Sequence, residues 1–478
     1  MAMAVLLRKV WGSVLARAAA GAAPPEAFAA AASPRRPQAA GEYGSLGALD
    51  VLPIDVLAQI LRLLGPADAA RSTAVCRAWR LLASDNGLWA FFLRLGPDPW
   101  ELVVFAETHL GAGPALHPGL YYDSSPQLSF KHVYTRRAVV PGSIIVDGMI
   151  LFDIHIVNLC VDRDIVSTDG ASMLLHLGVV RHSWNLATSS HLCMQGFVTS
   201  CPQSTPDTES ARASRKQYRD TLYSVLFDMN VPAVCSVDQA VLALYAAKRT
   251  SGIVVNIGFN ATSIVPIFQG RVMHEIGVET VGQGALKLTG FLKELMQQRN
   301  ITFESLYTVR TIKEKLCYVA ADYEAEKRKD TQASCEVDGE GWFTLSEERF
   351  KTAEILFQPQ IGGVRAMGLH KAVSLCMDHC YNSEVFGDDN WYKTVVLSGG
   401  SSCLPGLSER LEKELRELLP AHISEGIRVI PPPFGTDSAW FGAKMISNVS
   451  TFTEAWCIKK KQFRQKTRRN GPSFVNVW

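Results

Sequence analysis

The stretch Lys393–Leu419, KTVVLSGGSSCLPGLSERLEKELRELL, combines a strand pattern, a glycine-rich turn and a helix pattern. Thr394–Leu397 are mostly β-branched and apolar, which predicts a short buried strand. Ser398–Ser402 interrupts that run with two glycines. The helix pattern that follows has one apolar face at helical spacing, formed by Leu407, Leu411, Leu415 and Leu418.

This turn has two interpretations. Between a strand and a helix, backbone N–H groups can bind a phosphate or the edge of a nucleotide. The same residues can also form an ordinary connection in an α/β sheet, because a single Gly-Gly pair is weak evidence for nucleotide binding. Only the rest of the chain can distinguish the two.

Length and composition narrow the class of protein. A chain of 478 residues predicts two or three domains, and 47% apolar with 20% charged residues is typical of a globular protein. The net charge of +2 gives no overall attraction to nucleic acid, so any basic feature must be local. No run of about 18 apolar residues occurs, which predicts no membrane span and no membrane partner.

The cysteines indicate reduced thiols, because the 11 residues are scattered, odd in number and without a CxxC pair. One group of His and Cys side chains on a predicted helix could ligate a metal: His370, Cys376, His379 and Cys380. The simpler interpretation is that some of these side chains lie in the core and the others on the surface, since their spacing matches that of zinc sites poorly. We therefore predict no metal site.

The first 45 residues are rich in alanine. Met1–Ala40 contains five basic residues and a single acid, Glu26, a composition similar to an organellar transit peptide. A disordered leader without targeting function is the alternative, and it is the one we expect over residues 1–45.

The segment Leu49–Leu93 predicts a small helical module. Pro53 suits the first turn of a helix, and an apolar face follows at spacings of three and four, formed by Val56, Leu57, Ile60, Leu61 and Leu64. A second helix is expected to turn Val75, Cys76, Trp79 and Leu82 inward, beneath Trp89 and Phe92. So few residues form a thin core, which a partner could complete.

The order and spacing of these residues resemble an F-box over residues 46–95. The resemblance implies a trihelical module that docks on the adaptor subunit of a cullin–RING ubiquitin ligase. The contact residues it implies are Leu52, Pro53, Ile54, Leu57, Ile60, Trp79 and Trp89.

Residues 96–142 are predicted to be a linker with irregular packing, because they are rich in Pro, Gly, Tyr and His. A second domain is expected from residue 143. Ser143–Gly148 is a strand pattern that ends in Asp-Gly, a hairpin signal, and Gly252–Thr262 looks like a second copy of it. Two copies predict a duplicated α/β fold with a cleft between its halves. Further helices are expected at Glu209–Leu226, Leu286–Leu295, Tyr307–Glu326 and Leu369–Cys380.

Several segments, in this order, resemble actin and the actin-related proteins. They are Val237–Gly252, Ile312–Ala320 (IKEKLCYVA), Leu356–Pro359, Thr394–Gly406 and Ser438–Trp440. The resemblance implies an α/β, actin-like, two-lobed ATPase-type fold over residues 143–458, preceded by the small all-α F-box. That combination is similar to the plant F-box-containing actin-related proteins, the eighth class of that series.

The actin resemblance implies ATP and a divalent cation in the central cleft, with one phosphate hairpin and one acid from each lobe. Adenosine contacts carry over to Lys313, Glu314, Gly399, Gly400 and Ser401, and the glutamine that positions the attacking water carries over to Gln239. Gly258 and Thr262 match phosphate-hairpin positions.

The phosphate hairpins depart from the actin pattern. Asn256 and Phe259 replace the two acids of the second hairpin, and Asn260 replaces a glycine. In the first hairpin, Met149–Phe152 replaces Gly-Ser-Gly, whose amides approach a phosphate. We therefore predict no ATP hydrolysis and no catalytic residue beyond the matching Gln239, while weak nucleotide binding stays open.

Residues 149–206 do not match actin although both flanks do. Either a normal lobe segment is misread in this chain through splicing or a shifted frame, or the segment is a divergent insertion. The basic tail at 459–478 is consistent with a nuclear localisation signal, a nucleic-acid patch or a solvated tail. Because some actin-related proteins are nuclear, we predict a nuclear localisation, with the cytoplasm as an alternative or additional location.

Three hypotheses of function follow. The first is a non-enzymatic adaptor that joins an actin-like interaction body to a ubiquitin ligase, with nuclear, chromatin or actin partners. The second is a switch, or a subunit of a nuclear complex, in which weakly held ATP changes partner affinity. The third, a protein that joins actin filaments, is the weakest.

Overall fold

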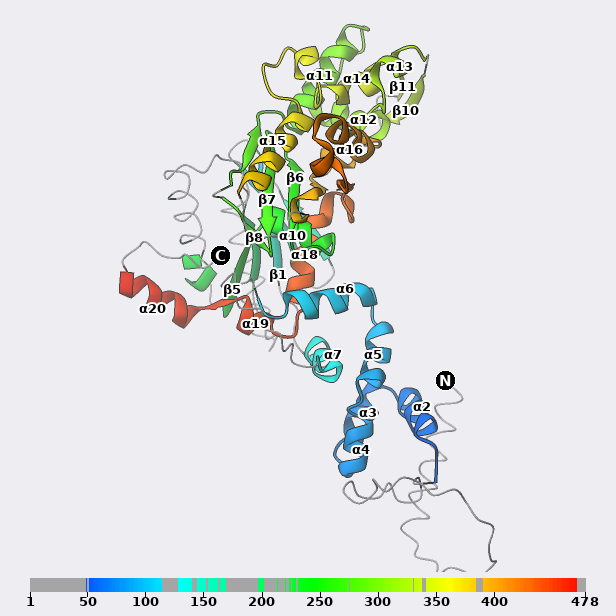
Figure 1. The fold of residues 1–478 in the computed structure, drawn as a ribbon, viewed down its shortest axis with the longest axis vertical. Helices are drawn as coiled ribbons and strands as arrows, with labels where there is room; N and C mark the ends of the chain where they lie inside the picture. The colour runs from blue at the N-terminus through cyan, green and yellow to red at the C-terminus, as the bar shows by residue number, and fades with distance from the viewer. Residues whose placement is uncertain are drawn as a thin grey trace, which may run out of the picture. The chain divides into compact units, whose positions relative to one another are not determined.

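Figure 1 shows the computed structural model of the chain. The structure describes residues 49, 51–113, 128–139, 144–151, 154–161, 164–168, 197–201, 213, 220, 223–224, 226–228, 231–274, 276–329, 331–337, 341–383 and 390–470. The predicted leader at 1–45 and most of the predicted helix Glu209–Leu226 lie outside these residues. The chain divides into a helical unit, up to Val103 with Ser124–Val139, and an α/β unit, Val104–Asp123 with Val140–Trp478.

The helical unit consists of short helices around a core of leucine and aromatic side chains. Gly65, with a φ of 85°, ends the first of them, and Pro66 begins the second at its first turn. Leu57, Leu61 and Trp89 are almost completely buried. The helices are α2 (Ile54–Leu64), α3 (Pro66–Ser72), α4 (Arg77–Leu82), α5 (Asn86–Arg94), the start of α6 (Trp100–Phe105) and α7 (Phe130–Val139).

Helix α7 completes the core of this unit. The rings of Tyr134 and Trp89 lie 5.2 Å apart. The Asn86 side chain donates to the Leu128 carbonyl at 2.9 Å and accepts from the Phe130 amide at 3.0 Å. The prediction of a linker is therefore wrong for residues 128–139, because this segment packs as a helix against the core of the helical unit. The thin core is completed at least in part by the same chain.

Val75 is a second correction. It is 69% exposed, because it lies in the turn between α3 and α4 instead of on the inner face of one continuous helix. Trp79, by contrast, is buried as expected.

Residues just after Val103 belong to the α/β unit. The π-helix η2 (Ala106–Leu110) packs there through its buried Glu107, whose carboxylate accepts from the Ser450 amide at 3.0 Å and the Ser450 hydroxyl at 2.8 Å. The Trp456 indole donates to the Leu110 carbonyl at 2.8 Å. This part of the predicted linker is thus a fixed component of the α/β unit.

The described part of the α/β unit contains two six-stranded sheets. The first has the order β14-β5-β4-β1-β2-β3 and the second β13-β12-β6-β7-β8, with β9 on β7. The strands are β1 (Ile144–Leu151), β2 (Ile154–Val161), β3 (Asp164–Thr168), β4 (Phe197–Cys201), β5 (Ala233–Asp238), β6 (Gly252–Ile257), β7 (Thr262–Phe268), β8 (Arg271–Val272), β9 (Glu279–Val281), β12 (Thr394–Ser398), β13 (Arg428–Ile430) and β14 (Ile458–Lys459).

Both sheets share one topology. In the first, β1, β2 and β3 run antiparallel to their neighbours, and β4 and β5 extend β1 in parallel. In the second, β6, β7 and β8 are antiparallel, and β12 and β13 extend β6 in parallel. This repeat confirms the predicted duplication.

The Asp-Gly signal does not end the first strand. Asp147 and Gly148 lie inside β1, paired with Asn158 and Val157 of β2, and the pairing continues to Leu151 and Ile154. The predicted turn position is wrong because Met149, Ile150 and Leu151 favour a strand and extend the pairing.

Two equivalent helices join the sheets. Helix α10 (Gln239–Ala246) follows β5, α18 (Ser438–Ser447) follows β13, and the two pack against each other (Figure 1). They approach so closely that a Cβ on Gly442 would lie 1.9 Å from the Leu242 carbonyl oxygen. Only glycine fits at that crossing.

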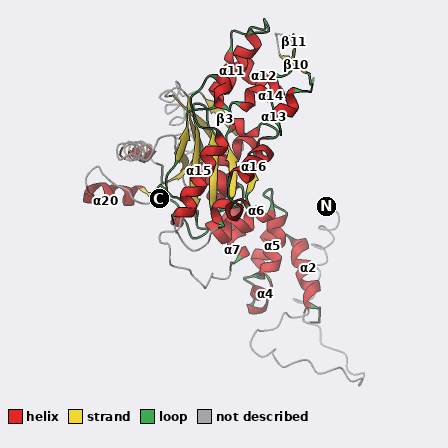
Figure 2. Cartoon of the chain, turned by 45° about the horizontal axis from the view of Figure 1, so that its top comes forward, coloured by secondary structure: helices red, strands yellow, loops and turns green. Residues whose placement is uncertain are grey.

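The stretch Lys393–Leu419 folds as β12, the 3-10 helix η6 (Gly400–Cys403) and α16 (Leu407–Leu418). Leu407, Leu411 and Leu415 are fully buried, whereas Leu418 is 46% exposed and was wrongly assigned to the apolar face. Figure 2 shows α16 and α15 (Leu369–Asn382) beside the strands, consistent with their contacts to β13 and to β7 and β9.

The α/β unit also contains further helices and a two-stranded ribbon. The predicted helix Tyr307–Glu326 breaks after Leu316, because the Tyr318 and Val319 amides donate to the carbonyls of Arg349 and Pro405. The other elements are α11 (Ala285–Gln297), α12 (Leu306–Leu316), α13 (Tyr323–Lys327), β10 (Ala333–Val337), β11 (Gly341–Leu345), α14 (Glu348–Glu354), η4 (Pro359–Gly362), η5 (Trp391–Lys393), α17 (Ala421–Ser424), η7 (Gly435–Asp437), α19 (Phe452–Ala455) and α20 (Lys460–Asn470). Within the described ranges, none of the helices has the length and apolarity to cross a membrane.

Candidate functional site

The Gly-Gly turn lies directly against the end of β6. Gly399 has a φ of 92°, and a Cβ there would come within 2.4 Å of the Ile257 carbonyl oxygen and 2.9 Å of the Asn256 side-chain oxygen. Gly400 begins η6 and is exposed, with only ordinary contact to Thr436. The turn therefore needs glycine at 399 for close approach of the backbone, while residue 400 faces open space.

Lys313 and Ser401 come together beside this turn, as the sequence predicted for an adenosine contact. Lys313 is 2% exposed, and its Nζ donates to the Thr289 hydroxyl at 3.2 Å and the Ser401 hydroxyl at 3.4 Å. Burial lowers the pKa of this amine, and the nearby Glu314 carboxylate opposes that shift. Two neutral hydroxyls thus hold a buried amine, an arrangement that an electron-rich ligand atom could stabilise further.

Glu314 lies on the opposite side of the same helix turn. Its side chain is 49% exposed and pairs with Arg310, with 2.8 Å between the Arg310 Nε and a carboxylate oxygen. The structure therefore divides the predicted Lys-Glu pair into one buried and one solvent-facing group.

Gln239 and Asn256 also come together. The Asn256 amide donates to the Gln239 side-chain oxygen at 3.4 Å, at the end of β6 where actins have an acid. Both groups are neutral, so this position cannot bind a hydrated cation as a carboxylate would. The bond also occupies one polar atom of the glutamine predicted to position water.

The second hairpin is closed by its own backbone. The Gly258 amide donates to the Ala261 carbonyl at 3.0 Å, and the amides of Ala285 and Leu286 donate to the carbonyls of Gly258 and Phe259. The Thr262 hydroxyl, 1% exposed, donates to the Gln283 carbonyl at 2.6 Å. Gly258 and Thr262 therefore support the hairpin, and Thr262 is not free to contact a ligand.

Gln283 is a residue that sequence reasoning missed. It is 2% exposed, and among the described residues neither atom of its side-chain amide has a hydrogen-bond partner. A polar residue between Gly282 and Gly284, just before α11, was the available signal. It lies in the segment that supports the second hairpin.

Together these residues fit an adenosine better than a metal-bound triphosphate. The close approach of Gly399 to β6 and the hydrogen bond between Lys313 and Ser401 are both present. The second hairpin, by contrast, offers no carboxylate to a metal. In the described part of the chain, no three His, Cys, Asp or Glu side chains are grouped to hold a metal ion. Cys376 and Cys380 are buried in the core, and His370 stacks on Phe357 with 5.9 Å between the ring centres.

The predicted partner residues of the helical unit divide into exposed and buried sets. Ile54 is 65% exposed, Pro53 is exposed, and Leu52 and Ile60 are half-buried. The predictions of Leu57, Trp79 and Trp89 as contact residues are wrong, because all three lie in the core at 2%, 6% and 1% exposure. Trp89 also donates its indole N–H to the Ala83 carbonyl at 2.7 Å. Val56 (42%) and Leu63 (57%) are exposed apolar residues of α2 that were not predicted as contacts.

Comparison with known proteins agrees with this architecture. The family model described as Actin matches residues 207–310 and 302–468, and that described as F-box-like matches residues 49–94. The chain therefore belongs to the actin family, with an F-box-like region ahead of its actin domain.

Full-length plant relatives make the class more specific. Two rice proteins, from the indica and japonica subspecies, and one from Arabidopsis thaliana are called Actin-related protein 8. The rice proteins are 86% identical over 494 residues, which cover all of both chains. The Arabidopsis protein is 53% identical over 476 residues, 97% of this chain and 99% of its own.

The divergent segment lies outside the actin match, which begins at residue 207. The rice alignments, at 494 positions, are also longer than the chain of 478 residues, so the rice proteins contain residues with no counterpart here. Both hypotheses for residues 149–206 remain predictions.

Proposed function

We propose that this protein is a non-enzymatic adaptor, which joins an actin-like interaction body to a cullin–RING ubiquitin ligase through its F-box-like region. The observation that carries the proposal is the exposure of three apolar side chains of α2, Ile54, Val56 and Leu63. These side chains lie outside a core that is already closed by Leu57, Trp89 and α7. Apolar side chains that the unit's own core leaves exposed are typical of an interface.

The neutral second hairpin supports the non-enzymatic half of the proposal. Phosphoryl transfer depends on a positioned metal and water, and Asn256 bonded to Gln239 provides neither a carboxylate nor a free glutamine. We expect the actin-like body to bind a client protein, in the nucleus, the cytoplasm or both, and nuclear, chromatin or actin partners are the classes to test.

A nucleotide-dependent switch is the second candidate. Buried Lys313, held by Thr289 and Ser401 beside the Gly399 turn, favours it. Weakly bound ATP would change partner affinity without being hydrolysed, provided that it binds one conformation of the cleft better than another.

Co-purification of the full-length chain with the ligase adaptor subunit tests the first proposal. Ile54→Asp with Val56→Asp places two charges at exposed positions of α2, so we expect loss of binding with no loss of folding. Leu95→Asp is the matched control, because Leu95 is 71% exposed in the same unit but lies after α5. Adaptor binding that is unchanged in the double variant would contradict the proposal.

A further inference from the structure

The last described helix concentrates positive charge in a chain that is otherwise acidic. Residues 459–469 contain seven Lys or Arg and no Asp or Glu. The whole chain has 48 basic and 46 acidic residues, so the remaining sequence has 41 and 46, a net charge of −5. The basic residues are Lys459, Lys460, Lys461, Arg464, Lys466, Arg468 and Arg469.

This helix is anchored to the α/β unit. Strand β14, directly before α20, pairs with β5 at the edge of the first sheet. The Lys460 ammonium donates to the Phe227 carbonyl, and the Phe463 ring lies 5.3 Å from Phe227 and 5.7 Å from Tyr223. The first turns of α20 therefore have a fixed position, and the face that carries Phe463 packs against Tyr223 and Phe227.

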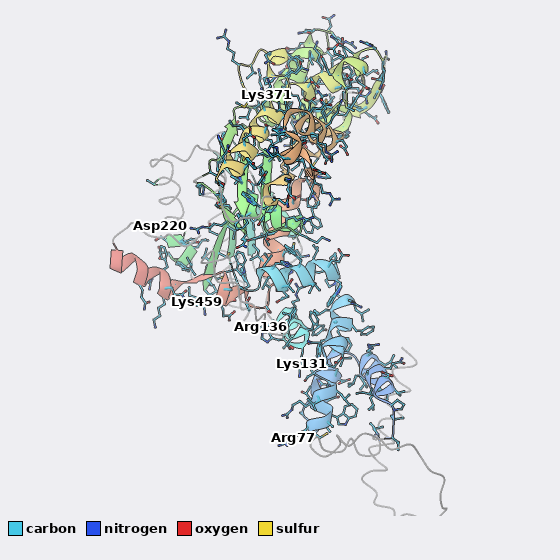
Figure 3. The ribbon with its side chains drawn as sticks, in the orientation of Figure 1. Arg77, Lys131, Arg136, Asp220, Lys371 and Lys459 are labelled. Carbon is cyan, nitrogen blue, oxygen red and sulfur yellow. The ribbon has the colours of Figure 1, made fainter. Side chains whose placement is uncertain are left out.

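Exposed basic side chains lie in α20 and directly before it. Lys459, at the end of β14, and Lys461 and Arg464 of α20 are exposed (Figure 3, where Lys459 is labelled). Lys461, Arg464 and Arg468 follow one another at three and four residues, the spacing that places residues on one helix face. Gln462, Gln465 and Thr467, between them, are polar.

We propose that α20 is a binding element for nucleic acid, which it recognises through the phosphate backbone and not through base sequence. Lys and Arg with intervening Gln and Thr are the side chains that contact phosphates. Lipid insertion needs an apolar face, and the single apolar residue of α20, Phe463, already packs on Tyr223 and Phe227. Protein interfaces rely on buried aromatic anchors, which the exposed side of this helix lacks.

The test is fluorescence anisotropy of labelled 20-nucleotide single-stranded RNA, single-stranded DNA and duplex DNA with the full-length chain, over a range of salt. We expect affinity to fall linearly with the logarithm of salt concentration. Lys461→Glu with Arg464→Glu should weaken binding at least about tenfold and reduce the salt slope by about 1.4 for single strands and about 1.8 for duplexes, since each phosphate contact contributes about 0.7 and 0.9.

Arg365→Glu with Lys371→Glu is the matched control, because both residues are exposed in the same unit and the charge change is identical (Lys371 is labelled in Figure 3). This control should stay within about threefold of the wild type. Lys461→Ala with Arg464→Ala keeps helix-compatible residues and should weaken binding in the same direction, and a thermal melt checks folding of each variant.

Absence of salt-dependent binding by the wild type would overturn the proposal. An equal loss in the control would also overturn it, because the effect would then be one of net charge. A third contrary result is α20-dependent binding to phosphatidylserine vesicles without binding to any of the three nucleic acids.

Discussion

The two sides of the candidate cleft differ in how much of their chemistry is retained. On the adenosine side, Gly399 contacts β6 through its backbone and Lys313 is buried between two hydroxyls. On the phosphate side, the side chains of Asn256 and Gln239 are hydrogen-bonded to each other, and the Thr262 hydroxyl donates to the Gln283 carbonyl. In the second hairpin, the groups that also support packing are present, whereas positions 256 and 259 carry no carboxylate for a metal.

This difference teaches that a fold can keep the residues of a ligand site that also serve packing while other residues of the same site change. Gly399 would be required by the contact between β6 and η6 even without a ligand. An acid at position 256 has no comparable packing role, since the neutral amide makes the bond to Gln239. Four predictions test this comparison.

The largest expected effect comes from the ion pair that supports the adenosine side. Arg410, 7% exposed, lies 3.3 Å from the fully buried Glu354 carboxylate and donates to the Ala320 carbonyl at 2.7 Å. Arg410→Met removes the cation beside that buried carboxylate and leaves it, among the described side chains, only the Gln358 amide as a partner, so we expect a loss of about 3–5 kcal/mol in the free energy of unfolding. Urea denaturation of the full chain measures it, and Lys413→Met, on the same helix but exposed, should change the transition little.

Gly399→Ala should have the next largest effect. The variant combines a left-handed backbone with a Cβ placed 2.4 Å from the Ile257 carbonyl oxygen, which should cost about 2–3 kcal/mol. Gly400→Ala is the matched control, because its nearest atom lies at 3.7 Å and its φ is not positive. Equal urea midpoints for the two variants would contradict the close approach of the turn to β6.

A smaller effect is expected from the pH dependence of stability at Lys313. Burial lowers the pKa of this amine below its ordinary 10.5, so the unfolded chain binds the proton more tightly than the folded chain. The free energy of unfolding is therefore lower while the Lys313 amine is protonated in the unfolded chain, and it rises as the pH increases toward 10.5. The difference in unfolding free energy between wild type and Lys313→Met should shift in favour of the wild type over that range. A difference that does not vary with pH would contradict a buried, destabilised ammonium.

Sequence reasoning identified the elements that depend on local pattern. The strand, turn and helix of Lys393–Leu419 and the duplication of the strand pattern were accessible, because periodicity and glycine positions determine them. The pairing of Lys313 with Ser401 was accessible only through resemblance, since 88 residues separate them in the chain.

The errors have a common physical cause, which is tertiary contact. Helix α7 was missed because its aromatic residues are far in sequence from Asn86 and Trp89, which hold it. Leu57, Trp79 and Trp89 were assigned to a partner surface although the core buries them. Exposure of Val56 could not be inferred either, because spacing alone does not show which apolar residues a short helix leaves outside.

The fourth prediction tests the central claim most directly, by comparing adenosine, ATP and Mg-ATP on the full-length chain. Thermal stabilisation and phosphate release are measured together at millimolar ligand, with Asn256→Asp as the comparison variant. We predict that Mg²⁺ adds no stabilisation beyond that of ATP alone and that phosphate release equals that of buffer, while Asn256→Asp introduces a dependence on Mg²⁺. Hydrolysis by the wild type, or stabilisation that requires Mg²⁺, would contradict a second hairpin that offers no carboxylate to a metal.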